Sequence, residues 1–81
     1  MSWNYRIIYH DVPESEMNGW EPWYGLHEVY YDDGKVRTWT VEAVRFLCED
    51  EEGADGVRKS LKMALDDANN RPVLIESETG V

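Results

Sequence analysis

Hydrophobic and polar residues alternate along the first segment of the chain, from Trp3 to Val12. A period of two residues is typical of a β-strand, because successive side chains of a strand point to opposite faces. Pro13 ends the alternation, and the following stretch PESEMNGWEPWYG has no periodicity, which predicts a loop. One face of the predicted strand carries Trp3, Tyr5, Ile7 and Tyr9, and the other face carries Asn4, Arg6, Ile8 and His10.

Two further alternating segments run from Tyr24 to Asp32 and from Val36 to Cys48. Asp33-Gly34 stands between them, and this dipeptide is the strongest short-range signal for the tight turn of a β-hairpin. The third segment is long enough to include a bend or a bulge. We therefore interpret the stretch YGLHEVYYDDGK as one strand of a hairpin and its turn.

The spacing of apolar residues changes after the acidic stretch EDEEGADG. Apolar residues then recur at intervals of three and four, which predicts an amphipathic helix. Asp55 is the expected N-cap or first-turn acid, and Pro72 ends the helix because it disfavours a helical Arg71. The stretch PVLIES predicts a short final strand. The apolar positions of the helix are Ala54, Val57, Leu61, Ala64, Leu65 and Ala68.

These elements follow one another in the order β-β-β-α-β. We therefore expect one α+β domain over residues 1–81, with a small antiparallel sheet of about four strands and one helix packed on one face. A chain of this length buries only about 60% of the surface that its unfolded form exposes, so the core is thin. Four Trp and five Tyr supply large buried areas for such a core.

The templates for catalysis are not met by this sequence. His27 and Glu28 are neighbours, and on a strand they point to opposite faces, so they cannot act on each other as acid and base. Cys48 is followed by Glu49 and Asp50, whose negative charges disfavour a reactive thiolate. The six glycines are scattered singly and form no phosphate-binding loop. We expect a protein that is not an enzyme and needs no cofactor.

The two histidines raise the question of a metal site. His10 could approach His27 if their strands pair, and Glu28 or Asp32 could then complete a set of ligands. The spacing matches no known zinc pattern, so we expect no metal site. The alternative is that both histidines are hydrogen-bonded residues of the strands.

The acid excess is the strongest overall signal in the composition. Seventeen acidic residues against eight basic ones give a formal net charge of −9. This charge disfavours direct binding to nucleic acid and to anionic membranes, and it favours a basic protein surface as partner. The alternative is that the charge only keeps the protein soluble.

The sequence also bears on the cellular compartment. One cysteine cannot form an internal disulfide, and a reducing compartment is therefore favoured. The N-terminal residues lack the pattern of a signal peptide, and no segment approaches the roughly 18 apolar residues of a transmembrane helix. We expect a cytoplasmic protein.

Acidic residues gather near both ends of the predicted helix. Those near its start exceed what capping requires, and Asp67 lies in the last turn, where the helix dipole disfavours an acid. Lys62 can offset Asp66 across one turn, but Asp67 has no such neighbour. Residues placed against local preference are candidates for function, although Asp67 could merely end the helix. The expected partner-binding acids are Glu49, Asp50, Glu51, Glu52, Asp55, Asp66 and Asp67.

Trp20 and Trp23 lie in the predicted loop, flanked by glycine and proline. A tryptophan in a loop either covers the core or projects as an anchor for a partner, and Trp is enriched among binding hot spots. Both residues are therefore further candidates for partner binding. Trp3 and Trp39 lie in predicted strands and are expected in the core.

Three stretches carry a resemblance to known proteins: WNYRII at residues 3–8, HEVYYDDGK at 27–35 and RPVL after the helix. With them, the chain resembles a group of small, mostly uncharacterised bacterial and phage proteins. The resemblance implies the fold but no chemistry, and VEAVRFLCED departs from the acidic or proline-containing turn that the group often has. In size and charge alone, the chain is similar to phage anti-CRISPR inhibitors, many of which block DNA-binding surfaces.

Two functions remain as hypotheses. In the first, the acidic residues occupy the basic nucleic-acid channel of an RNA-guided defence complex in the cytoplasm of a host cell, and the protein is an inhibitor. In the second, the chain is a structural or adaptor module, monomeric or homodimeric, whose aromatic or strand-edge surface is the contact.

Overall fold

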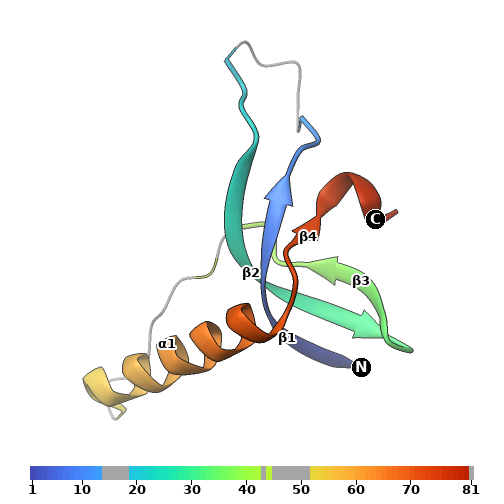
Figure 1. The fold of residues 1–81 in the computed structure, drawn as a ribbon. Helices are drawn as coiled ribbons and strands as arrows, with labels where there is room; N and C mark the ends of the chain where they lie inside the picture. The colour runs from blue at the N-terminus through green and yellow to red at the C-terminus, as the bar shows by residue number, and fades with distance from the viewer. Residues whose placement is uncertain (14–18, 43, 45–51, 81) are drawn as a thin grey trace.

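The computed structural model describes residues 1–13, 19–42, 44 and 52–80. Within these residues, four strands and one helix follow one another in the predicted order β-β-β-α-β, so the α+β class is confirmed. The last strand is shorter than the predicted PVLIES, because a short 3-10 turn begins at Glu76. No helix within the described residues combines the length and the hydrophobicity needed to cross a membrane. The elements are β1 (Ser2–His10), β2 (Trp23–Asp32), β3 (Lys35–Trp39), α1 (Gly53–Asn70), β4 (Leu74–Ile75) and the 3-10 turn η1 (Glu76–Glu78) (Figure 1).

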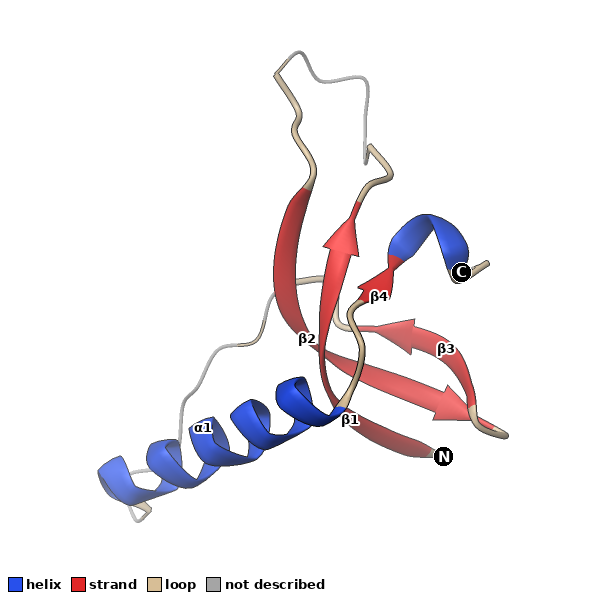
Figure 2. Cartoon of the chain, viewed as in Figure 1, coloured by secondary structure: helices blue, strands red, loops and turns tan. Residues whose placement is uncertain are grey.

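The four strands form one sheet in the order β3-β2-β1-β4. β1 pairs with β2 and β2 with β3 in antiparallel fashion, as predicted. The last strand differs, because β4 runs parallel to β1 through the pairs Ile8–Leu74 and Tyr9–Ile75. The sheet is therefore mixed and not purely antiparallel. Parallel strands require a crossover connection between them. Helix α1 lies in the connection that leads to β4 and packs beside the sheet (Figure 2).

The predicted hairpin turn is confirmed in its backbone geometry. Asp33 has φ +52° and Gly34 has φ +76°, so both central residues are left-handed. This is the signature of a type I′ turn, whose twist matches that of the two flanking strands. Glycine adopts this conformation without strain, and Asp is among the few other residues that tolerate it.

The third strand is shorter than predicted, because β3 ends at Trp39 and not at Cys48. A register shift between Tyr30 and Tyr31 leaves Arg37 as an extra residue on β3. Such a bulge bends a strand and increases its local twist, and the pairing with β2 resumes at Thr38.

Pairing with β2 continues beyond the end of β3 at two points. The N–H of Thr40 donates to the carbonyl of Glu28 at 3.1 Å, and that of Val44 donates to the carbonyl of Leu26 at 2.8 Å. Residue 43 and residues 45–48 of the predicted strand lie outside the described residues.

The two faces of the β1–β2 pair are unequal in burial. Residues opposite each other in the register share a face, and the buried face holds Ile8, His10, His27 and Val29. Trp3 lies on the other face and is 46% exposed, so its expected place in the core was wrong. Among the described residues, the core of this small domain therefore contains two histidines, of which His27 is fully buried.

Helix α1 packs against β1, and Ala64 is its buried residue. Asp55 lies in the first turn, as predicted, and no side chain caps the helix start. Arg71 has an extended backbone directly before Pro72, so the helix ends where the sequence predicts. The first turns of α1 extend away from the sheet (Figure 1).

Candidate functional site

The predicted acidic residues divide into three groups. Glu49, Asp50 and Glu51 lie outside the described residues. Glu52 and Asp55 are exposed at the start of α1. Asp66 and Asp67 lie in its last turns, where Asp66 is exposed and Asp67 is half-buried.

The described acids of the helix do not form one continuous patch. Asp55 and Asp66 are eleven positions apart, which is roughly 16 Å along a helix axis. Arg58, Lys59 and Lys62 lie between them, and the Arg58 guanidinium contacts the Asp55 carboxylate at 2.7 Å. Negatively and positively charged residues therefore alternate along the outer side of α1.

Asp67 has a structural role inside the fold. Its carboxylate accepts the backbone N–H of Tyr5 at 3.1 Å. β4 pairs with β1 only at Ile8 and Tyr9, so Asp67 supplies a partner at a point that the sheet leaves open. Burial, then the charges of Glu28 and Asp67, raise the pKa of Tyr5. The placement of Asp67 against the helix dipole thus has an explanation in folding.

The two candidate tryptophans also differ in position. Trp20 is half-buried in the segment before β2, as predicted for a loop. Trp23 was predicted in that loop, but it is the first residue of β2. Its indole stacks on the imidazole of His10, with ring centroids 4.1 Å apart and planes 20° apart. Trp23 is 37% exposed and therefore covers His10 with one ring face.

Beneath Trp23, His10 and His27 form a buried polar arrangement. The pairing of β1 with β2 brings His10 next to His27, as expected if these strands pair, and the two Nε2 atoms are 2.9 Å apart. His10 is 4% exposed and His27 is fully buried. Two buried imidazoles at this distance must share a hydrogen bond, because two lone pairs would repel each other.

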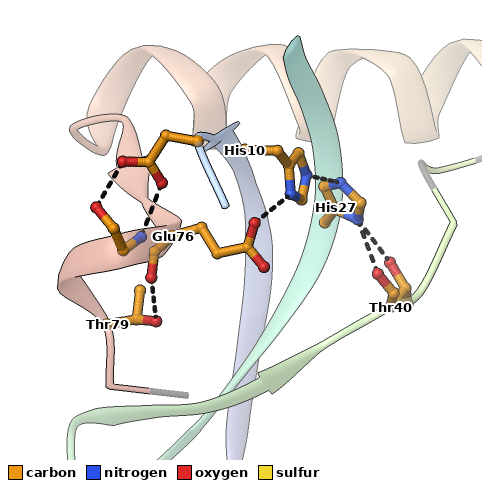
Figure 3. A network of polar contacts seen from close by, with 7 residues as sticks. His10, His27, Thr40, Glu76 and Thr79 are labelled. Carbon is orange, nitrogen blue, oxygen red and sulfur yellow. Dashed lines mark hydrogen bonds and ion pairs between the residues drawn. The ribbon is translucent and has the colours of Figure 1, made fainter. Parts of the chain in front are cut away.

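Both outer nitrogens of the pair also have partners, as Figure 3 shows. His10 Nδ1 lies 3.2 Å from Oε1 of Glu76, and His27 Nδ1 lies 2.8 Å from the carbonyl oxygen of Thr40. The hydroxyl of Thr40 is 3.4 Å from the same His27 nitrogen. We call Glu76, His10, His27 and Thr40 the histidine cluster.

The residues around Glu76 fix its position in the histidine cluster. Both carboxylate oxygens of Asp11 accept hydrogen bonds from Ser77, one from its N–H at 2.9 Å and one from its hydroxyl at 2.5 Å. The Thr79 hydroxyl donates to the Glu76 carbonyl at 2.8 Å. The hydrogen bond from the Ser77 hydroxyl is the main reason that the pKa of Asp11 is lowered. These contacts tie η1 to the end of β1.

The surroundings of the cluster favour a neutral His27. Burial lowers the pKa of His27, because the imidazolium form loses hydration there, while the hydrogen bond to the Thr40 carbonyl acts in the opposite direction. The absence of a side chain at Gly25 leaves space for the Trp23 indole over His10. A Cβ at this position would lie 2.6 Å from the Trp23 ring and 2.8 Å from His27 Nε2.

The acids considered for a metal site lie elsewhere. Glu28 is on the opposite face and accepts a hydrogen bond from the Tyr30 hydroxyl at 3.3 Å, and Asp32 lies 3.9 Å from Arg37. Over the described ranges, no group of three or more His, Cys, Asp or Glu side chains is arranged to hold a metal ion. Glu76 and Thr40, which do complete the cluster, were missed in the sequence, because neither carries a local signal for a contact so far along the chain.

Comparison of the chain with protein-family models, with curated proteins and with solved structures gave no match.

Proposed function

We propose that the chain is a non-enzymatic protein-binding inhibitor of the anti-CRISPR type, which occupies the basic nucleic-acid-binding surface of an RNA-guided defence complex. The observation that carries the proposal is the excess of 17 acidic over 8 basic residues. In this mechanism carboxylates replace phosphates as partners of lysine and arginine. Long-range attraction speeds the encounter, and salt weakens it.

Helix α1 offers such a partner both charge and apolar area. Glu52 and Asp55 are exposed at its start and Asp66 near its end. Between them, Leu61 and Leu65 are 47% and 60% exposed, and their spacing of four places them on one side of the helix. An apolar centre with a polar rim is the usual anatomy of a protein interface, which supports docking of α1 in a groove.

The basic residues of α1 set a condition on the partner. Lys59 and Lys62 share a surface hollow with Asp66. A groove that receives this helix therefore needs an acidic group among its basic ones. Complementarity of this kind fixes the orientation of docking more than it adds affinity.

Asp66 is the residue whose charge reversal tests the proposal. Reversal at Asp67 would remove the partner of the Tyr5 N–H and disturb the fold. Asp66 is exposed, so Asp66→Lys changes surface charge alone. Glu21→Lys is the matched control, because it makes the same change in net charge at an exposed position before β2. The segment before β2 lies at the end of the molecule away from α1 (Figure 1).

The assay follows target DNA binding by a purified RNA-guided complex, with and without the protein, at two salt concentrations. We expect loss of DNA binding that high salt relieves, and inhibition roughly tenfold weaker for Asp66→Lys, which corresponds to about 1.4 kcal/mol. Glu21→Lys should inhibit like the original chain. Equal inhibition by all three proteins contradicts a role for Asp66, and no inhibition of several such complexes contradicts the proposed function.

The exposure of Leu61 and Leu65 favours a second function, that of an adaptor module that forms a homodimer through α1. Large apolar side chains exposed together mark contact surfaces. The solution mass at low and high salt tests this function: a dimer that ignores salt and dissociates with Leu65→Gln supports it, and a monomer at both salts contradicts it. Replacing Trp23 is a poorer test, because Trp23 stacks on His10 within the fold.

A further inference from the structure

The hydrogen-bond distances in the histidine cluster determine which ring nitrogens carry a proton. The carbonyl of Thr40 only accepts, so the 2.8 Å contact requires a proton on His27 Nδ1. In a neutral His27, Nε2 then carries a lone pair. The 2.9 Å contact between the two rings therefore requires His10 to donate from its Nε2.

This arrangement leaves one further proton to place. His10 Nδ1 faces the Glu76 carboxylate at 3.2 Å, and a hydrogen bond there needs a proton on the nitrogen or on the oxygen. In either case the cluster holds one proton more than two neutral imidazoles and a carboxylate would hold. Its net charge is then zero, which burial favours over an uncompensated carboxylate.

The same side chains can also satisfy one another without the extra proton. His10 Nδ1 then donates to Glu76, and His27 donates from Nε2 to His10 Nε2. His27 Nδ1 becomes an acceptor, for which the Thr40 hydroxyl at 3.4 Å is the available donor. This state is less favourable at Thr40, because its carbonyl oxygen at 2.8 Å then faces a lone pair.

We propose that the histidine cluster is a buried proton-binding site, which takes up one proton and thereby reverses the direction of the hydrogen bond between His10 and His27. With the proton bound, His27 is held by the Thr40 carbonyl. Without it, His27 is held by the Thr40 hydroxyl. Binding of the proton therefore acts on the backbone just after β3 at one end and on η1 at the other (Figure 3).

The charged groups around the cluster are consistent with a single proton. Glu76 comes from η1, and Asp11, at the end of β1, is held by Ser77. Arg6 is opposite His27 in the register, but its guanidinium donates to the Tyr31 hydroxyl at 3.2 Å and to the Pro72 carbonyl at 2.9 Å. The positive charge of His10 opposes a second proton on His27, and burial does so more strongly.

The direct test is nitrogen-15 NMR of the imidazole rings in the full chain, from about pH 5 to about pH 8.5, a range that spans the ordinary histidine pKa. We expect His27 to change tautomer, from a proton on Nδ1 at low pH to a proton on Nε2 at high pH, in step with His10. One tautomer of His27 throughout, or two independent proton uptakes, would overturn the proposal.

Two variants at Thr40 sharpen this test. Thr40→Val keeps the carbonyl and removes the hydroxyl, so it weakens only the proton-free state. Proton affinity should rise roughly two- to tenfold, as expected for one hydrogen bond. Thr40→Ser keeps the hydroxyl and should titrate like the original chain. Equal titration of all three proteins would contradict the part given to the hydroxyl.

A metal ion is the competing occupant of the space between the two Nε2 atoms. In metal sites, too, the outer ring nitrogen of a ligating histidine donates to a carboxylate or a carbonyl. The probe is Zn²⁺ added to the folded chain, followed by calorimetry and by the same NMR signals. Tight one-to-one uptake that His10→Asn abolishes would overturn the assignment of a proton, and no uptake supports it.

Discussion

The histidine cluster and the outer side of α1 hold polar side chains in opposite environments. In the cluster, every ring nitrogen of His10 and His27 lies within hydrogen-bond distance of a partner, and both rings are buried. On α1, Asp55 and Arg58 contact each other at 2.7 Å while both remain exposed. A buried polar group without its partner costs far more than an exposed one, so the two regions should answer differently to substitution.

This difference separates the two kinds of experiment that the molecule allows. Changes in the cluster report on stability and on protonation, because its side chains are enclosed by the fold. Changes on α1 report on partner binding, because the fold does not depend on the exposed side chains there. Asp67 is the exception, since it lies on α1 but accepts a hydrogen bond from the backbone N–H of Tyr5 in β1.

His27→Ala should have the largest effect on stability. It removes a fully buried ring, leaves a cavity, and deprives His10 of its partner at 2.9 Å. The free energy of unfolding should fall by about 3 kcal/mol, as measured by urea denaturation. Lys35→Ala, at an exposed position of β3, is the control and should change it by less than about 0.5 kcal/mol. A loss below about 1 kcal/mol for His27→Ala would contradict the role of the cluster in the core.

Gly25→Ala should have the next largest effect. The added Cβ would lie 2.6 Å from the Trp23 ring and 2.8 Å from His27 Nε2, so the Trp23 indole that stacks on His10 must move. Overpacking of this kind costs about 1–3 kcal/mol. Tryptophan fluorescence should change together with stability, because Trp23 leaves its place over His10. A variant with unchanged fluorescence and stability would show that the cover is loosely packed.

The elements of the fold could be predicted because each depends on neighbours in sequence. Alternation placed β1 and β2, Asp33-Gly34 placed the hairpin turn, and the intervals of three and four placed α1. The parallel pairing of β4 could not be predicted, since two residues of β4 carry no signal for their partner. Glu76 follows β4 directly, so its contact with His10 was hidden for the same reason.

The acidic residues show a second limit of the sequence. Asp66 and Asp67 are neighbours in the same turn, but successive residues differ by about 100° around a helix axis. Asp66 therefore faces solvent and Asp67 faces β1. The sequence does not show this difference, because the two residues are identical. The bulge at Arg37 is a similar case, because the extra residue shifts the register of β3 and the sequence does not show at which residue this shift falls.

The pH dependence of stability follows from His27. Its pKa is lowered in the folded state, so the unfolded chain takes up a proton that the folded chain resists. Stability should therefore fall as the pH drops below about 6.5, the ordinary histidine pKa, by up to about 1.4 kcal/mol per pH unit. Urea denaturation between about pH 7.5 and about pH 5 measures this slope. His27→Gln should reduce it, and an unchanged slope would assign the pH dependence to other groups.

The smallest expected effect distinguishes two neighbours on α1. Asp67→Ala removes the acceptor of the Tyr5 N–H and should lower the free energy of unfolding by about 1–2 kcal/mol. Asp66→Ala is the matched variant, because it removes the same side chain from an exposed position, and it should change stability by less than about 0.5 kcal/mol. Thermal denaturation of both proteins decides the comparison. Equal losses would mean that the contact between Asp67 and β1 contributes nothing measurable to stability. Both Asp66 and Asp67 would then be available for binding a partner.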